Sequence, residues 1–263
     1  MYFSVKNMKE FLISLLMKNL KLAAAQSASI KGDLHKNIIN HLRFAEAAKL
    51  YNADFILFPE LSLTGYEPDL AENLALYPDD RKLKPLADFA SANRIIIAAG
   101  APLKGSDNRI NIGLLCFMPD GEIKIHTKEY LHPGEEKYFA PGTIKCAIDL
   151  NNEIIALAVC ADTSHPEHSE EAAGKGASIY AVSALCSEKG YIGDTEFLNE
   201  YSGKYGFLVL LSNHSMKTGG WVPCGRSGFW HKGKLIKSMP GNAQGIVIAE
   251  KISEHWTCEI IYL

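Results

Sequence analysis

The 263-residue sequence has little that suits a membrane or a nucleic acid. Its formal net charge is only −3, from 27 Lys and Arg against 30 Asp and Glu, so no basic surplus exists to attract polyanions. The apolar run at 11–16 is too short for a membrane span and short even for a signal-peptide core. We therefore expect a cytoplasmic protein that has neither nucleic acid nor membrane as a partner.

Closely spaced cysteines are also missing. Disulfide scaffolds are small and dense in cysteine, and zinc sites usually pair their ligands at short spacing, but this chain has no CxxC pair. We expect a reduced, intracellular protein with mostly structural thiols. The scattered cysteines are Cys116, Cys146, Cys160, Cys186, Cys224 and Cys258.

Apolar runs alternate with helical patterns along most of the chain. The spacing of apolar residues predicts helices at 34–51, 83–93 and about 195–205, and Pro119-Asp120-Gly121 predicts a hairpin. Strands and helices in alternation indicate an α/β fold, and the hairpins make its sheets mixed. We expect a single domain over 20–263, with 1–19 as an N-terminal extension outside the core.

One stretch combines a buried strand with a reactive side chain. The apolar run from Ile154 to Val159 ends on Cys160, and a helical pattern opens at Glu167. This predicts a thiol at the carboxyl end of a strand, where α/β sheets bind ligands. Nearby helix-terminal N–H groups would favour the thiolate. A buried structural cysteine fits the stretch equally well.

Two more reactive residues follow predicted strands. Glu60 comes after the run FILFP, and Lys128 comes after IKIHT. If the three strand ends meet, a glutamate could take the proton of a cysteine nucleophile, and a lysine could stabilise negative charge on a substrate oxygen. The backbone N–H of Ala161 would be a second oxyanion donor. Taken singly, each charged residue is better explained as a solvated surface group.

The segments around these residues resemble a known family. FPELSLTGYEP around Glu60, KEYLHPGEEKYFAPG from Lys128 and CADTSHPE from Cys160 are similar, in order and spacing, to the three conserved blocks of the nitrilase superfamily, the carbon–nitrogen hydrolases. The tail, with Asn213 and the segment from Gly225 to Ser227, is similar as well. The resemblance runs from about residue 20 to the C-terminus.

The resemblance implies roles for four residues. Glu60 would be the general base, Lys128 would support the tetrahedral intermediate, and Cys160 would be the nucleophile. A second glutamate would position the lysine and the substrate nitrogen, and counting back from the Tyr-Phe-x-Pro-Gly segment favours Glu135 over Glu136.

The resemblance also implies a fold and an assembly. The expected architecture is a four-layer α-β-β-α sandwich of two mixed sheets, and the chain would pair as a homodimer or a higher homo-oligomer. The reaction would need no metal and no organic cofactor, only an amide-like small molecule and water.

The expected activity is hydrolysis of a non-peptide carbon–nitrogen bond through a cysteine thioester, with release of ammonia or an amine. Nitrilases carry Cys-Trp-Glu at the nucleophile, whereas this chain has Cys-Ala-Asp, which favours an amidase over a nitrile hydrolase. Ser164 stands where many dicarboxylic monoamide amidases carry an arginine. A small aliphatic amide or an N-carbamoyl amine remains open, and Tyr66, Ser183 and Trp221 are candidates for the pocket.

Three other interpretations stay possible on sequence alone. Cys160, His165 and His168 could hold zinc, or His165 could be the base of a cysteine–histidine hydrolase. The chain could also be a catalytically idle scaffold or binding protein of the same fold.

Overall fold

The computed structural model describes residues 19–105 and 108–263. The predicted N-terminal extension therefore lies outside the described residues, except for Asn19. The side-chain amide of Asn19 donates a hydrogen bond to Glu250 Oε1 at 2.9 Å. None of the helices in the described part is long and apolar enough to cross a membrane.

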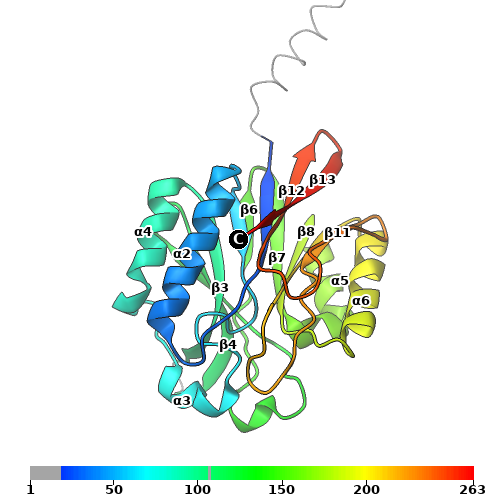
Figure 1. Cartoon of the computed structure of the whole chain (residues 1–263). Helices are drawn as coiled ribbons and strands as arrows, with labels where there is room; N and C mark the ends of the chain where they lie inside the picture. The colour runs from blue at the N-terminus through cyan, green and yellow to red at the C-terminus, as the bar shows by residue number, and fades with distance from the viewer. Residues whose placement is uncertain (1–18, 106–107) are drawn as a thin grey trace, which may run out of the picture.

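Among the described residues, two mixed β-sheets pack face to face, and helices cover both outer faces (Figure 1). This is the predicted four-layer sandwich. The first sheet has the order β13 (His255–Tyr262), β12 (Gly245–Ile252), β1 (Lys21–Gln26), β2 (Phe55–Leu57), β3 (Ile96–Lys104), β4 (Ile110–Phe117) and β5 (Ile123–Thr127). The second has the order β11 (Lys234–Ser238), β10 (Gly228–His231), β9 (Leu208–Asn213), β8 (Ile179–Ala184), β7 (Glu153–Val159) and β6 (Ala147–Leu150).

The helices divide between the two outer faces. Helices α2 (Leu34–Leu50) and α4 (Lys84–Asn93) lie on the first sheet, and α5 (Pro166–Gly174) and α6 (Tyr191–Lys204) lie on the second (Figure 1). The short helix α3 (Ala71–Leu74) lies in the loop that follows β2. The remaining helical turns are of the 3-10 type, at Pro68–Leu70, Arg81–Leu83, Glu135–Lys137 and Cys160–Ser164.

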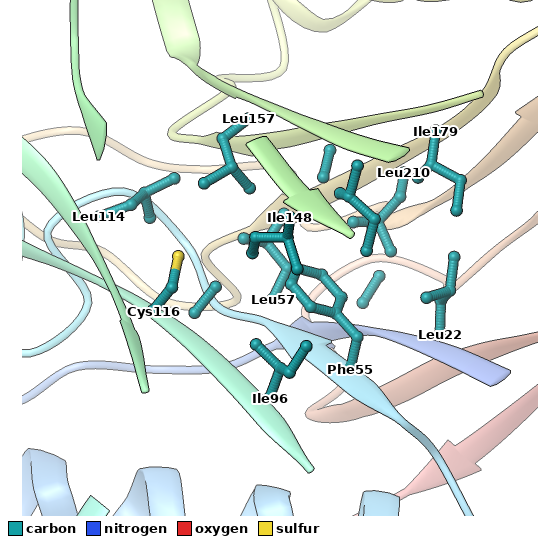
Figure 2. Close-up of a cluster of buried hydrophobic side chains, with 14 of the residues drawn as sticks. Leu22, Phe55, Leu57, Ile96, Leu114, Cys116, Ile148, Leu157, Ile179 and Leu210 are labelled. Carbon is teal, nitrogen blue, oxygen red and sulfur yellow. The ribbon is translucent and has the colours of Figure 1, made fainter. Parts of the chain in front are cut away.

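The strands are apolar on both faces because both faces are covered. In β1, Leu22 and Ala24 belong to the core between the sheets, whereas Ala23 and Ala25 belong to the core under the helices. Side chains alternate between the faces of a strand, so the sequence of a strand that is buried on both sides is a continuous apolar run. Figure 2 shows Phe55 at the centre of the core between the sheets.

The carboxyl ends of β2 and β7 lie at the same edge of the sandwich as the loop after β5, as shown by the contacts of Lys128 with Glu60 and of Glu129 N with Asp162. Strands β1, β2 and β3 are parallel, as are β7, β8 and β9. The loop after β2 can lie flat on β3 because residue 100 is glycine. A Cβ atom at Gly100 would lie 2.3 Å from the backbone nitrogen of Leu61 and 2.9 Å from the carbonyl oxygen of Pro59.

Helix α6 begins earlier than the sequence pattern predicts, at Tyr191 rather than near Thr195. Ser187 explains the difference, because its carbonyl oxygen accepts from Tyr191 N at 2.9 Å and its hydroxyl accepts from Gly190 N at 3.2 Å. The earlier start brings Asp194 into the first turn of the helix.

We expect Phe55→Ala to lower the free energy of unfolding by about 3–5 kcal/mol, because the ring is fully buried between the sheets and its loss leaves a cavity. Urea unfolding followed by circular dichroism measures the change. Ile192→Ala is the control, because that side chain is 67% exposed on α6 and should cost no more than about 0.5 kcal/mol. Equal losses in the two variants would contradict this description of the core.

Candidate active site

Three buried charged side chains meet where the strand ends converge. Lys128 Nζ lies 2.7 Å from Glu60 Oε1 and donates to Glu135 Oε1 at 2.8 Å. Lys128 and Glu60 are fully buried and Glu135 is 3% exposed. The structure therefore brings Glu60, Lys128 and Glu135 together, and Cys160 lies beside them.

The charges in this group do not balance, because two carboxylates face one ammonium. Burial raises the pKa of Glu60 to about 7, with Glu135 adding to the rise and Lys128 opposing it. Burial alone would lower the pKa of Lys128, but Glu60 and the other acidic neighbours outweigh it and raise the pKa. Lys128 is thus a fixed cation at neutral pH, while Glu60 can change its protonation state there.

Glu135, rather than Glu136, is the second glutamate of the group. Glu135 Oε1 also accepts from the Tyr66 hydroxyl at 2.6 Å, and Oε2 accepts from His132 N at 2.7 Å. Glu136 is exposed and accepts from Gly134 N at 2.6 Å. Burial raises the pKa of Tyr66, and the charge of Glu60 raises it further, so the hydroxyl keeps its proton.

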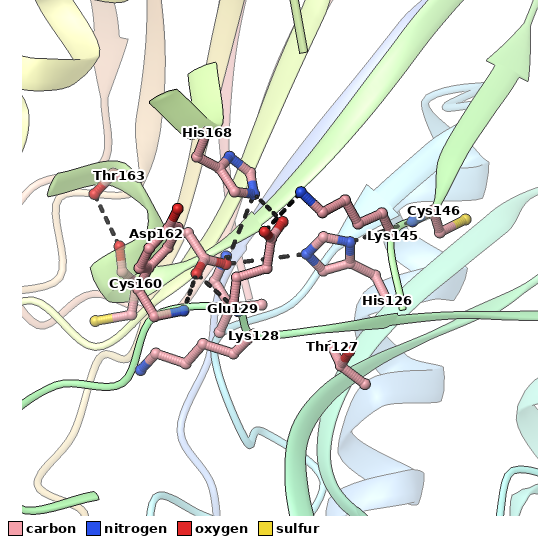
Figure 3. Close-up of polar contacts among 12 residues, drawn as sticks. His126, Thr127, Lys128, Glu129, Lys145, Cys146, Cys160, Asp162, Thr163 and His168 are labelled. Carbon is pink, nitrogen blue, oxygen red and sulfur yellow. Dashed lines mark hydrogen bonds and ion pairs between the residues drawn. The ribbon is translucent and has the colours of Figure 1, made fainter. Parts of the chain in front are cut away.

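Cys160 directly follows β7 and opens a 3-10 turn in a strained backbone conformation, with a φ of 46°. Residues with a Cβ atom rarely adopt a positive φ, and such strain persists only where the surroundings impose it. In Figure 3 the Cys160 thiol and the Lys128 ammonium point to the same side, away from His126 and His168.

The expectation that helix-terminal N–H groups hold Cys160 as a thiolate is wrong for the resting protein. Burial raises its pKa well above 9, and Glu60 adds to the rise. Lys128 and a hydrogen bond from the backbone N–H of Leu185 act in the opposite direction but do not prevail. The side chain is therefore a thiol that needs a base to become a nucleophile.

Asp162 connects the cysteine segment to the lysine segment. Its Oδ2 accepts from Val159 N at 2.9 Å, and its Oδ1 accepts from Glu129 N at 3.0 Å and Tyr130 N at 2.9 Å. The side chain is fully buried. Because these donors flank Cys160 and Lys128, one carboxylate fixes both side chains relative to each other.

A cavity of about 160 Å³ opens over Cys160 and Glu60. Tyr66, Ala161 and Trp221, all predicted pocket residues, contribute to its wall. The complete lining is Glu60, Tyr66, His132, Cys160, Ala161, Thr163, Ser164, Leu185, Ser187, Gly190, Asp194 and Trp221.

Ser183 was also predicted in the pocket, but it is not part of this lining. Its hydroxyl is fully buried in β8 and donates to the Phe58 carbonyl oxygen at 2.8 Å. Ser183 therefore links the two sheets instead of facing the cavity.

One group within the described residues has the composition of a metal site. Ligand atoms of His126, Asp162 and His168 lie within 4.8 Å of one another (Figure 3). However, His126 Nδ1 accepts from Cys146 N at 3.4 Å, which places the ring proton on Nε2, facing Asp162 Oδ2 at 4.0 Å. A protonated nitrogen has no lone pair for a metal, so we assign this group to the support of Asp162.

The alternative roles of His165 do not fit its surroundings. Its ring stacks on Tyr130 with centroids 3.7 Å apart, and Nδ1 lies 3.4 Å from Glu167 Oε1. His168 faces Glu129 and Asp162 instead, on the side away from the Cys160 thiol (Figure 3). Cys160, His165 and His168 thus do not converge on one point.

Sequence reasoning missed several parts of the site. Asp162 is a neighbour of Cys160, but nothing in the sequence shows that it accepts three backbone N–H groups. The Leu185 N–H belongs to the backbone, so no residue type in the sequence could indicate its hydrogen bond with Cys160. The sequence pattern leaves Ser187 and Asp194 outside the predicted helix. The two residues line the cavity because α6 begins at Tyr191.

Comparison with known proteins identifies the family of the chain. The carbon–nitrogen hydrolase family model matches residues 21–250. A glutamine-dependent NAD(+) synthetase of Thermotoga maritima is 25% identical over 214 residues, which are 77% of this chain and 36% of that protein. A probable hydrolase of Bacillus subtilis, YhcX, is 28% identical over 60% of this chain and 34% of its own length. The chain spans about a third of the length of these relatives.

Solved structures show the same fold. An amidase from Nesterenkonia sp. AN1 superposes with a TM-score of 0.81 at 22% identity, covering 88% of this chain and 90% of that one. That structure contains the acetamide moiety of fluoroacetamide added covalently at the active-site cysteine. Another structure of the amidase, a cysteine-to-alanine mutant, is a complex with butyramide and covers 89% of this chain and 92% of that one, again with a TM-score of 0.81. With its family match over most of its length, the chain belongs to the carbon–nitrogen hydrolases of the nitrilase superfamily.

Proposed function

We propose that this chain hydrolyses small amides through a thioester on Cys160. The observation that supports this most directly is the pairing of a protonated thiol with Glu60, whose pKa of about 7 suits a general base at neutral pH. Glu60 Oε2 is buried without a hydrogen-bond partner among the described residues, so it is free to accept a proton.

In the first half of the reaction, Cys160 attacks the amide carbon while its proton passes to Glu60. Negative charge then develops on the carbonyl oxygen, and Lys128 stabilises it because its ammonium is already in place and buried. The Ala161 N–H is the second proposed oxyanion donor. Glu60 returns the proton to the leaving nitrogen, the carbon–nitrogen bond breaks, and ammonia or an amine departs.

In the second half, water attacks the thioester carbonyl carbon. Glu60 takes a proton from this water, and the second tetrahedral intermediate collapses with cleavage of the carbon–sulfur bond. The proton returns to Cys160, and the carboxylic acid is released. Glu135 holds the Lys128 ammonium throughout, with its own oxygens fixed by Tyr66 and His132 N–H.

The cavity supports a small substrate, because about 160 Å³ is less than the roughly 300–1,000 Å³ of pockets for drug-sized ligands. Small aliphatic amides and N-carbamoyl amines both fit this size, and nitrile hydrolysis by the same residues is the runner-up reaction. The similar synthetase of Thermotoga maritima is glutamine-dependent, which also raises glutamine as a source of ammonia. A catalytically idle scaffold is disfavoured, because it would have no use for a strained cysteine beside a buried base.

We expect Cys160→Ala to lower amide hydrolysis by at least about a thousandfold, because no other group takes the place of the thiol. Acid quenching during turnover and intact-mass spectrometry should reveal an acyl adduct on the wild-type chain and none on the variant. Cys258→Ala is the control, since this half-buried thiol of β13 is not part of the cavity lining. Full turnover by Cys160→Ala would refute the thioester route.

We expect kcat/KM of the wild type to rise with pH through an apparent pKa of about 7 and then level off, because Glu60 must be ionised to accept the thiol proton. Glu60→Gln should lower kcat/KM by roughly 10²–10⁴ and abolish this limb. The matched control is Glu136→Gln, which removes an exposed carboxylate next to Glu135 and should leave both values unchanged. If Glu60→Gln shows the same rise of kcat/KM with pH, a group other than Glu60 causes it.

A further inference from the structure

We propose that Asp194 forms a subsite for a positively charged amino group on the acyl chain of the substrate. The preferred substrate would then be an aliphatic amide that carries an ammonium at its far end. This inference rests on the proposed function, and it names the substrate class of that same site.

The charges that line the cavity are the first support. Two carboxylates, Glu60 and Asp194, contribute to the wall, and no Lys or Arg is among the described residues that line it. Lys128 lies fully buried beside the cavity and is held by Glu60 and Glu135. Once Glu60 is assigned to the chemistry, Asp194 is the charge left to recognise the rest of the substrate.

The surroundings of Asp194 are the second support. Its side chain is only partly exposed, and no ion pair with Lys or Arg is found for it in the described part of the chain. Burial raises its pKa, while a hydrogen bond with the Cys186 thiol and the charge of His132 act in the opposite direction. A partly buried carboxylate without a cation is costly, and a cationic ligand would offset that cost.

His132 is the competing partner, because it lines the same cavity. Its Nδ1 lies 3.1 Å from the Pro133 carbonyl oxygen, and its ring packs edge-on against Trp221 with centroids 5.9 Å apart. No hydrogen bond or ion pair joins His132 to Asp194 in the described part of the chain. His132 therefore does not occupy the Asp194 carboxylate, and a cationic ligand in the cavity can contact it.

The position of Asp194 fits a short acyl chain. Asp194 and Cys160 line the main cavity together, and they also share a smaller void with Cys186. An amide carbon at the thiol would thus leave its acyl substituent within the same small chamber as the carboxylate. A substrate whose far end carries a carboxylate alone would face repulsion from Asp194 without a matching Lys or Arg in the lining, whereas glutamine carries an ammonium beside its carboxylate.

Three amides of similar size test the proposal: 4-aminobutanamide, pentanamide and succinamic acid. They end in an ammonium, a methyl group and a carboxylate. With the wild-type chain we expect kcat/KM for 4-aminobutanamide to exceed that for pentanamide by at least about tenfold, with succinamic acid the poorest. Equal values for 4-aminobutanamide and pentanamide would overturn the proposal without any variant being needed.

The variant Asp194→Asn tests whether Asp194 causes the preference for 4-aminobutanamide over pentanamide. The ratio of kcat/KM for 4-aminobutanamide over pentanamide should fall to about one, and the deficit of succinamic acid should shrink. Glu196→Gln, which removes an exposed carboxylate from the same helix, should leave the ratio unchanged. An unchanged ratio in Asp194→Asn would overturn the assignment. Failure of the wild type to hydrolyse any amide would instead refute the proposed function, and this inference with it.

Discussion

The geometry of the site depends on one buried carboxylate that reacts with nothing. Asp162 accepts backbone N–H groups from the end of β7 and from the loop after Lys128, so it joins segments from different sheets. Burial would raise its pKa, but the facing histidines and these donors keep the pKa below its ordinary value. A carboxylate that stays ionised in a low-dielectric interior makes strong hydrogen bonds, and these can hold the Cys160 backbone in its positive-φ conformation.

The imbalance of charge next to Asp162 gives the site its chemistry. With one ammonium between two carboxylates, the group retains a negative charge when all three are ionised, and burial makes that state costly. Glu60 relieves the cost by taking up a proton near pH 7, whereas Lys128 cannot relieve it by losing one. Burial raises the pKa of the neighbouring Cys160, and the negative charges of Glu60 and Glu135 add to the rise. The excess of negative charge thus acts on both the proposed base and the proposed nucleophile.

The sequence predicted the parts that follow from strand patterns. Runs that stop before Glu60, Lys128 and Cys160 located three strand ends, and resemblance to a family supplied the expected roles and the choice of Glu135. The protonation state of Cys160 could not be predicted, because it depends on how closely two carboxylates, distant in the sequence, approach a partly buried sulfur. Asp194 was missed because Ser187 starts α6 earlier than the apolar spacing suggests. Ser183 was misplaced because a short polar residue in a strand gives no sign of whether it faces a cavity or another sheet.

The complete burial of Lys128 has a practical consequence for chemical modification. Amine-reactive reagents acylate only a neutral, accessible amine, and this ammonium is neither, since its pKa is raised and no surface of it is exposed. Lysines such as Lys36 and Lys82, whose side chains are 64% and 69% exposed, would react first. The chain can therefore be coupled to a solid support or a fluorophore through its surface amines while the ammonium beside Cys160 stays intact.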